Sequence, residues 1–309
     1  MQSLVHIAVG LLAITSTALG HGKPVSPNQA MFRQSHEAKM RRALETCGST
    51  LMKRDVHDAR LAKREAALTE HASALGLGES GALAVRDLIN SGTNASCVLT
   101  PESEEGPYYA NGSIIRHDSR EDQPGIPILL DVQVTDVRTC EPIEGVMLDF
   151  WNANATGVYS DMEDEGTLGT WWLRGIRKTD EYGLAQHVSI FPGFYAGRAQ
   201  HMHIKAHVNY TVHDNNSTIS FGAVPHTGQL FFDQSTLTQI NKVPPYTLDT
   251  NTFTTNVDDR VLTSQANSTR YDPFVEIRSM GYNLTGGVLG FINLAIDPTA
   301  TPGDAGTMG

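Results

Sequence analysis

Two hydrophobic patterns divide this chain. Between Asn28 and about Ile89, apolar residues are spaced among Lys, Arg and Glu with few glycines or β-branched residues, which predicts helices. Beyond Gly92, short apolar runs are broken by Gly, Pro, Asn and Asp, which predicts strands. The runs cover residues 126–137, 146–151, 187–191, 201–208, 228–232 and 288–296. Because no helical pattern separates them, the predicted fold class is mainly β: a β-sandwich preceded by an α-helical N-terminal segment.

The two ends of the chain carry patterns of their own. An apolar run over residues 4–14, followed by the small residues Ala18 and Gly20, predicts a secretory signal peptide over residues 1–20 and is too short to span a membrane. The small, polar residues 299–309 predict a disordered tail. We therefore expect a helical segment over 21–92, which packs on the next domain or pairs two subunits as a homodimer, and a β-sandwich domain over 93–298.

Composition adds a compartment and excludes one class of partner. Lys and Arg number 23 against 34 Asp and Glu, a net charge of −11, which argues against binding nucleic acid. No further stretch is apolar enough to expect a membrane partner. The many Asn-x-Ser/Thr sequons predict a secreted, extracellular glycoprotein. They occur at Asn94, Asn111, Asn154, Asn209, Asn215, Asn216, Asn267 and Asn283.

The three cysteines are Cys47, Cys97 and Cys140. An odd number in a secreted chain leaves one thiol unpaired or bridging two chains. The favoured interpretation is one structural disulfide and one buried thiol.

The candidate chemistry centres on His201-Met202-His203. Side chains alternate along a strand, so both imidazoles point to the same face, where they can bind a metal ion. Tyr195 and Arg198 lie just upstream and add a phenolic oxygen and a fixed positive charge. Taken alone, the pair is equally consistent with a strand that carries two polar residues.

Together with its neighbours, this stretch resembles the intradiol ring-cleavage dioxygenases, and most closely their secreted fungal branch. Three blocks carry the resemblance over roughly residues 97–235, in the family's order and spacing. The blocks are Leu99-Thr100-Pro101-Glu102 with Gly106-Pro107-Tyr108-Tyr109; Val132-Gln133-Val134 to Thr139-Cys140 with Trp151-Asn152-Ala153-Asn154-Ala155-Thr156-Gly157-Val158-Tyr159; and Leu173-Arg174-Gly175, Thr179-Asp180, Gly183 and residues 192–203.

The resemblance implies one Fe(III) per chain and cleavage of a catechol-type ring by O2 between its hydroxylated carbons, giving a muconate-type dicarboxylic acid. The implied metal ligands are Tyr159, Tyr195, His201 and His203, with Tyr195 as the ligand released by substrate. Arg198 is the implied residue that stabilises negative charge, Gln229 orients a substrate oxygen, and Tyr108 lines the substrate pocket. Two phenolates and two imidazoles are donors that suit ferric iron.

The chain departs from the fungal branch at Ala153, where that branch usually has cysteine. If that cysteine normally pairs with the one at Cys140, the resemblance leaves Cys47 and Cys97 as the expected disulfide.

Other protein classes share parts of this pattern. A cupin also carries His-x-His on a strand, but it has a glutamate a few residues later. In this chain no carboxylate occurs between His203 and Asp214. A copper mono-oxygenase would use His21 as its amino-terminal ligand, and a catalytically decayed sandwich would only bind phenolics. His207 shares the parity of His203 but is expected at the surface, while His187 and His226 have no identified ligand partner.

Overall fold

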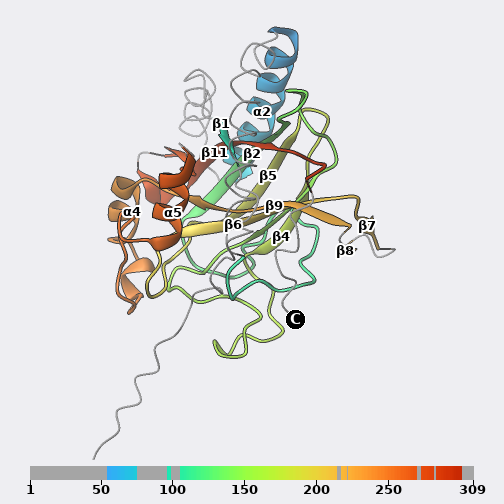
Figure 1. Cartoon of the computed structure of the whole chain (residues 1–309). Coiled ribbons are helices and arrows are strands. Elements are labelled where there is room, and N and C mark those ends of the chain that lie inside the picture. Colours follow the sequence, from blue (N-terminus) through green and yellow to red (C-terminus); the bar gives the residue numbers. More distant parts are fainter. Residues whose placement is uncertain are drawn as a thin grey trace, which may run out of the picture.

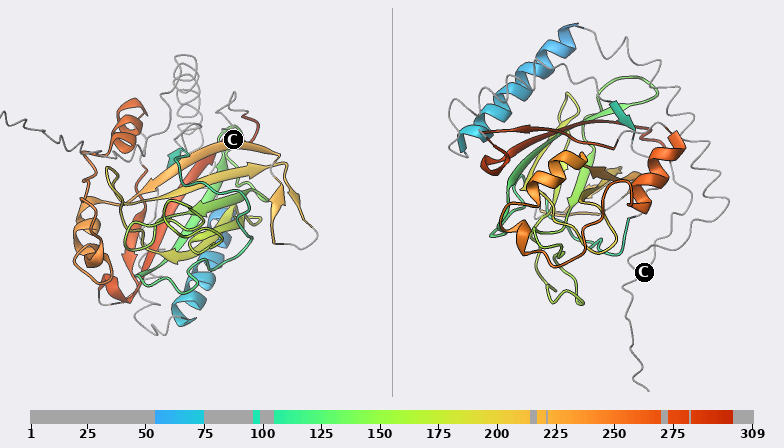
Figure 2. Two further views of the ribbon diagram at one scale, coloured as in Figure 1. Left: turned by 90° about the horizontal axis from the view of Figure 1, so that it is seen from below. Right: turned by 90° about the vertical axis from the view of Figure 1, so that its left-hand side faces the viewer.

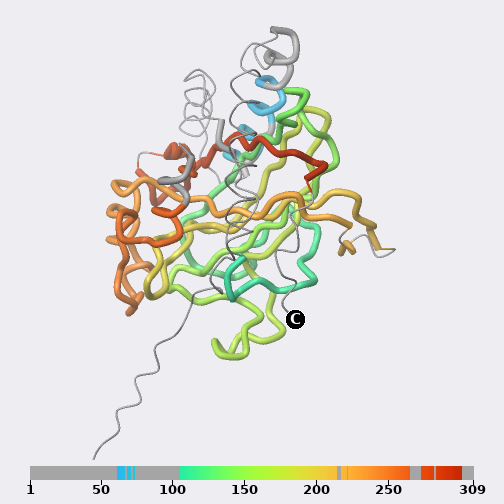
Figure 3. The backbone as a smooth tube through the Cα atoms, in the orientation of Figure 1, coloured from blue at the N-terminus to red at the C-terminus, as the bar shows by residue number. Residues whose placement is uncertain are grey.

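Two β-sheets packed face to face form the body of the protein (Figure 1). The computed structural model describes residues 54–74, 96–98, 105–213, 217–220, 222–269, 273–281 and 283–300. Figure 3 traces the path of the backbone in the same orientation as Figure 1. Outside this description lie the predicted signal peptide, Cys47 and residues 301–309. The same holds for the sequon residues Asn94, Asn215 and Asn216 and for the side chain of Asn267. The predicted mainly-β sandwich with a helical N-terminal segment is confirmed.

The first sheet has the order β1-β11-β2-β5, and β10 pairs with β11 along the same edge as β1. Strands β11 and β2 are parallel, whereas β2 and β5 are antiparallel. The bounds are β1 Ser96–Val98, β2 Pro127–Asp136, β5 Leu184–Ile190, β10 Glu276–Ser279 and β11 Val288–Ile296.

The second sheet has the order β4-β3-β6-β9 and is antiparallel throughout. Its strands are β3 Met147–Trp151, β4 Arg174–Lys178, β6 His201–Val208 and β9 Ala223–Phe231. On β6, Met202 and Ile204 point into the core between the sheets. Alternation therefore turns His201, His203 and Lys205 to the outer face of this sheet. That outer face carries the polar residues described below.

Helix α2, Arg54–Ala74, covers the outer face of the first sheet (Figure 2). Leu68 packs against Leu129 and Phe291 in one apolar cluster. Beside this cluster, Arg64 Nε lies 2.8 Å from Asp131 Oδ1, and both side chains are buried. The first role expected for the helical segment, packing on the β domain, is therefore the one α2 takes. Pairing of two subunits stays a prediction.

Several elements were missed by the hydrophobic pattern. The expectation of strands without intervening helices is wrong, because α4, Gln234–Ile240, and α5, Arg260–Thr269, both lie within the β domain. Helix α4 is short and mostly polar, and its start depends on the side chain of Asp233, which accepts the N–H groups of Ser235 and Thr236. Also missed were strands β1, β4 and β10, the hairpin of β7 Thr211–Val212 and β8 Ile219–Ser220, and the short helices η1 Tyr246–Leu248 and η2 Leu284–Gly286.

The cysteine prediction is corrected at Cys140, which is disulfide-bonded. Because the chain has only three cysteines, a Cys140 disulfide excludes the expected Cys47–Cys97 pair. Sequence spacing could not reveal this, since the bond depends on how the chain folds back on itself. None of the described helices is long and apolar enough to cross a membrane.

Candidate metal centre

The four side chains predicted as metal ligands lie in one buried cluster on the outer face of the second sheet. His201 and His203 come from β6, Tyr159 from the loop after β3 and Tyr195 from the loop after β5. Ring centroids are 4.7 Å apart for the two histidines and 5.7 Å apart for the two tyrosines. Tyr195 lies 5.7 Å from His201, and Tyr159 lies 6.2 Å from His203.

Close backbone contact holds the two tyrosine loops together. The N–H of Gly193 donates to the carbonyl of Asn154, which also accepts the N–H of Gly157. A Cβ at Gly157 would lie 2.0 Å from the carbonyl oxygen of Phe194, and one at Gly193 would lie 2.3 Å from that of Asn154. No side chain fits at either position, so the glycine two residues before each tyrosine allows the two loops to come into contact.

The hydrogen bonds of His201 leave one of its nitrogens available for a metal. Its Nδ1 donates to the carbonyl oxygen of Ala199 at 2.7 Å, because a carbonyl can only accept. The remaining Nε2 lies 3.1 Å from Nε2 of His203. Burial, followed by the charge of Arg198, lowers the pKa of His201, and burial lowers that of His203 well below its usual value. Both imidazoles are therefore neutral, which is the form that binds metals.

The two tyrosines differ in their surroundings. Burial raises the pKa of Tyr195 to about 12 and that of Tyr159 well above its usual value. Tyr195 Oη accepts a hydrogen bond from Arg198 at 3.2 Å, whereas Tyr159 Oη is buried without a hydrogen-bond partner among the residues the structure describes. An orphaned buried hydroxyl is costly unless a further group binds it.

These donors fit the iron that the family resemblance implies. Within the described ranges, no group of three or more His, Cys, Asp and Glu side chains could hold a metal ion. A metal at this cluster would therefore take tyrosine oxygens in addition to the imidazoles of His201 and His203. Two hard phenolate oxygens and two imidazole nitrogens suit Fe(III).

Arg198 links this cluster to two further side chains. Its Nε lies 2.9 Å from Asp259 Oδ2, and its Nη2 donates to Gln229 Oε1. Gln229 on β9 pairs in register with His203 on β6. Arg198 and Gln229 could be named from the sequence but Asp259 could not, since no local pattern marks a residue that lies 61 positions from its partner.

Aromatic rings complete the surroundings of the ligands. Tyr108 stacks on Tyr159, with centroids 4.5 Å apart and planes at 13°, and meets Tyr195 edge-on at 5.2 Å. On the other side, Trp151 stacks on His203 at 4.6 Å and 10°. No role was predicted for Trp151, although strand alternation on β3 places it on the outer face of the second sheet.

The surface position expected for His207 is wrong. His207 is fully buried, with Nε2 at 3.9 Å from Asp149 Oδ2. The segment that begins at Glu105 covers this end of β6: Lys205 Nζ lies 2.7 Å from Glu105, and Tyr109 donates to Asp149. The alternation of side chains along a strand predicts which face a side chain lies on, but not whether a loop covers that face.

His187 and His226, for which the sequence indicates no ligand partner, hydrogen-bond residues outside the cluster. His187 Nε2 hydrogen-bonds Ser119 Oγ at 3.0 Å, and His226 Nε2 accepts the backbone N–H of Asp297 at 2.9 Å. Both side chains are buried within the β domain.

The chain is similar to known dioxygenases in both sequence and structure. Residues 103–237 match the family model Dioxygenase_C, described as dioxygenase. An intradiol ring-cleavage dioxygenase from Tetranychus urticae is similar at 30% identity and a TM-score of 0.56, over 66% of this chain and 97% of that structure. A second solved dioxygenase structure matches at 30% identity and a TM-score of 0.55, with the same coverage.

One curated relative adds a sequence match of narrower extent. Catechol 1,2-dioxygenase 1 of Acinetobacter lwoffii is 29% identical over 101 residues, which make up 31% of this chain. The match spans about a third (32%) of the length of that relative.

Proposed function

Because the chain belongs to the family of intradiol ring-cleavage dioxygenases, we propose that it opens catechol-type rings with O2 at an Fe(III) centre. The substrate would be cleaved between its two hydroxylated carbons, and both oxygen atoms would enter a muconate-type dicarboxylic acid. The observation that carries this proposal is the convergence of two tyrosine and two histidine rings in one buried cluster, in which Tyr159 Oη has no hydrogen-bond partner among the described residues.

The proposed ligands are Tyr159, Tyr195, His201 and His203. When bound, Fe(III) would supply the Lewis-acid and redox chemistry that lets a catechol ring react with dioxygen. The neutral imidazoles need not lose a proton to bind it, and the two phenols would lose theirs.

The two tyrosines take different roles in this proposal. Tyr195 Oη already has a second partner in Arg198, so it can hold a proton received from the substrate without being left unsatisfied. Tyr159 Oη has no such alternative among the described residues, which supports a permanent role as ligand.

Arg198 and the covering segment provide the rest of the proposed site. The buried guanidinium of Arg198 keeps its positive charge at any working pH and would stabilise negative charge that develops on the substrate. Gln229 fixes the direction of this guanidinium and would orient a substrate oxygen. Tyr108, stacked on Tyr159, would form one wall of the substrate site and exclude water.

The proposal is tested with the purified full chain loaded with Fe(III). We expect a visible tyrosinate-to-iron absorption band, oxygen uptake with members of a panel that contains catechol and hydroxyquinol, and a ring-opened product that carries both atoms of isotope-labelled O2. Tyr159→Phe should lose most of the band and the activity. Binding of catechols without any oxygen uptake would instead identify a non-catalytic phenolic-binding protein.

We further propose that the protein is secreted and glycosylated, as expected of the fungal branch that the sequence blocks resemble. The Cys140 disulfide supports this, because such bonds persist in oxidising compartments. The sequon residues Asn111, Asn209 and Asn283 are exposed. Asn154 is half-buried, and its amide donates to Gln123, so it is the sequon least suited to carry a glycan. Peptide mass spectrometry before and after deglycosylation of protein from the culture medium would test both points.

A further inference from the structure

Arg174 is a buried arginine whose guanidinium reaches two loops of the candidate metal centre. It lies on β4, pairs in register with Trp151 on β3, and is 1% exposed. Within the described part of the chain, no carboxylate forms an ion pair with it. Burying an unpaired guanidinium is costly, and its Nη1 has no hydrogen-bond partner among the described residues. The hydrogen bonds of its Nε and Nη2 must therefore account for its position.

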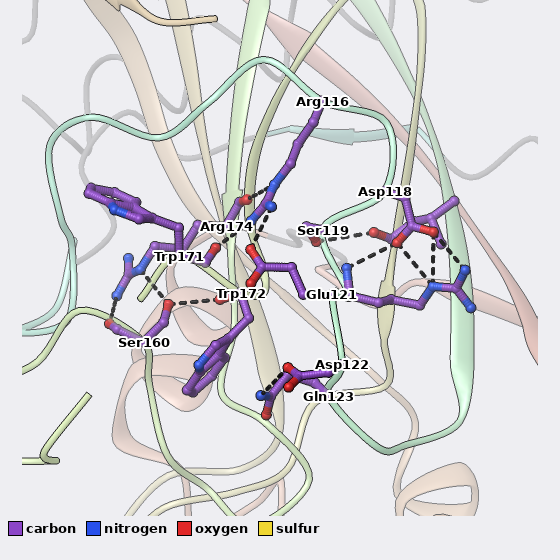
Figure 4. A network of polar contacts seen from close by, with 12 residues as sticks. Arg116, Asp118, Ser119, Glu121, Asp122, Gln123, Ser160, Trp171, Trp172 and Arg174 are labelled. Carbon is purple, nitrogen blue, oxygen red and sulfur yellow. Dashed lines mark hydrogen bonds and ion pairs between the residues drawn. The ribbon is translucent and has the colours of Figure 1, made fainter. Parts of the chain in front are cut away.

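The hydrogen bonds of Arg174 join the loop of Tyr159 to the segment of Tyr108. Figure 4 shows the part of this link that runs from Arg174 to Ser160. Nε donates to Ser160 Oγ at 2.9 Å, and Nη2 donates to the carbonyl oxygen of Ser160 at 2.7 Å. The same Nη2 donates to the carbonyl oxygen of Tyr108 at 2.8 Å. Ser160 directly follows Tyr159 in the chain, so one guanidinium fixes the backbone beside both stacked tyrosine rings.

The acceptor at Ser160 is itself held in place. Ser160 Oγ donates to the carbonyl oxygen of Trp172 at 2.7 Å, and both side chains are buried. The hydroxyl therefore accepts a hydrogen bond from Arg174 and donates one to the backbone of Trp172, so its orientation is fixed. A planar guanidinium can serve three fixed acceptors at once, whereas a lysine ammonium is a single point of donation.

We propose that Arg174 is a positioning residue for the dioxygenase reaction. It holds Tyr108 parallel to Tyr159, and so sets both the orientation of a ligand oxygen and the place of a substrate-site wall. The inference rests on the proposed function, because it assigns Arg174 a role toward the proposed ligand Tyr159. It predicts that Arg174 affects the metal's electronic spectrum and the choice between catechols of different size through geometry as well as through charge, so a substitution that keeps the charge should still have an effect.

The test compares three variants with a matched control, all as Fe(III)-loaded full chains. Arg174→Lys keeps the charge and loses the planar guanidinium, and Arg174→Gln loses both. Ser160→Ala removes the two hydrogen bonds of Oγ, with Arg174 and with the carbonyl oxygen of Trp172. The control is Arg177→Lys, since Arg177 is a half-buried arginine on the same strand that faces the opposite side of the sheet. The readouts are iron content, the position of the tyrosinate-to-iron band, and KM and kcat for catechol and for a bulkier, ring-substituted catechol.

We expect both Arg174 variants to shift the band and to raise KM about tenfold or more, with a larger effect on one catechol than on the other. Ser160→Ala should shift the band in the same direction by less, and Arg177→Lys should match the wild type. If the Arg174 variants fail to fold, Ser160→Ala decides the matter. A wild-type band and wild-type KM in Arg174→Lys, or in Ser160→Ala where that variant decides, would overturn the inference. Absence of any band in the loaded wild type would instead overturn the proposed function itself.

Discussion

Arg198 Nε lies 2.9 Å from Asp259 Oδ2, and both side chains are almost completely buried. The same carboxylate oxygen accepts the N–H of Ala199 at 2.7 Å, and Oδ1 accepts the N–H of Leu262 at 2.9 Å. Burial opposes ionisation of Asp259, but Arg198 and these hydrogen bonds hold the pKa of its carboxyl below the usual value. Asp259 thus joins the start of α5 to the loop between Tyr195 and His201.

Replacing Asp259 by asparagine should weaken both activity and stability. The change keeps the shape of the side chain but leaves the buried Arg198 without its counter-charge, which costs about 3–5 kcal/mol for a broken buried pair. Loss of the orientation of Arg198 should lower kcat/KM by about 10–100-fold. Oxygen-uptake kinetics and denaturant unfolding measure the two effects. Asp258→Asn, at an exposed neighbouring position, is the control and should change neither quantity appreciably.

The residues of this site that lie in short sequence motifs could be predicted from the sequence. Tyr159, Tyr195, His201 and His203 each lie in a short block whose residue types could be compared with the family. Strands β6 and β11 were predicted with the correct bounds because their apolar runs end sharply at polar or turn residues.

What the sequence did not reveal depends on contacts between distant segments. The Asp259–Arg198 pair, the stacking of Trp151 on His203 and the cover over His207 all need the fold before they can be seen. The charged strand β4 was missed for a related reason. Its Arg174 is buried by loops from elsewhere in the chain, so strand β4 lacks the alternating apolar pattern expected of a half-exposed strand.

Gly106 is a further position at which we expect a change to affect a proposed metal ligand, His203. Its φ is +79°, and a Cβ placed there would lie 3.3 Å from Cε1 of His203. Gly106→Ala should therefore cost about 1 kcal/mol of stability from backbone strain and should also displace the His203 ring. We expect about tenfold weaker iron binding and a shifted visible band, measured by iron titration of the metal-free protein.

Gly166→Ala separates these two effects. Gly166 has a similar φ of +69°, but nothing lies within 4 Å of the position of its Cβ. It should lose a similar amount of stability and keep the iron affinity of the wild type. Equal iron affinity in the two variants would show that the segment around Gly106 does not support His203.

Asp149 should make stability depend on pH. Burial raises the pKa of its carboxyl to about 7, although hydrogen bonds from Ser113 and Tyr109 and the positive charges of Lys205 and Arg174 act in the opposite direction. The buried His207 also faces it, and its pKa is lowered by burial to about 3, so it adds no charge above that pH. Because the folded-state pKa of Asp149 exceeds the unfolded value of 3.8, the folded protein holds this proton more tightly.

The resulting contribution to stability is complete below the unfolded pKa and is lost as the pH rises through the folded pKa. Asp149→Asn has no such titration, so its free energy of unfolding relative to wild type should rise by on the order of 2 kcal/mol between about pH 5 and about pH 8. Denaturant unfolding at both pH values measures this. The exposed Asp122→Asn should show no comparable change, and a constant difference for Asp149→Asn would contradict the prediction.

The pair of Arg64 and Asp131 predicts how strongly helix α2 is bound to the β domain. Asp131 lies in the middle of β2, where only Arg64 and the amide of Gln186 satisfy its buried carboxylate among the described residues. Arg64→Met keeps the apolar contact over Phe291 but leaves this charge unpaired, so we expect a loss of about 3–5 kcal/mol in the free energy of unfolding. Adding Asp131→Leu should recover much of it, because the whole position then becomes apolar. Lys63→Met removes two solvent-accessible ion pairs, with Asp180 and Glu181, and should cost far less, since water screens them. Equal losses for Lys63→Met and Arg64→Met in denaturant unfolding would mean that the buried pair does not hold α2 on the sheet.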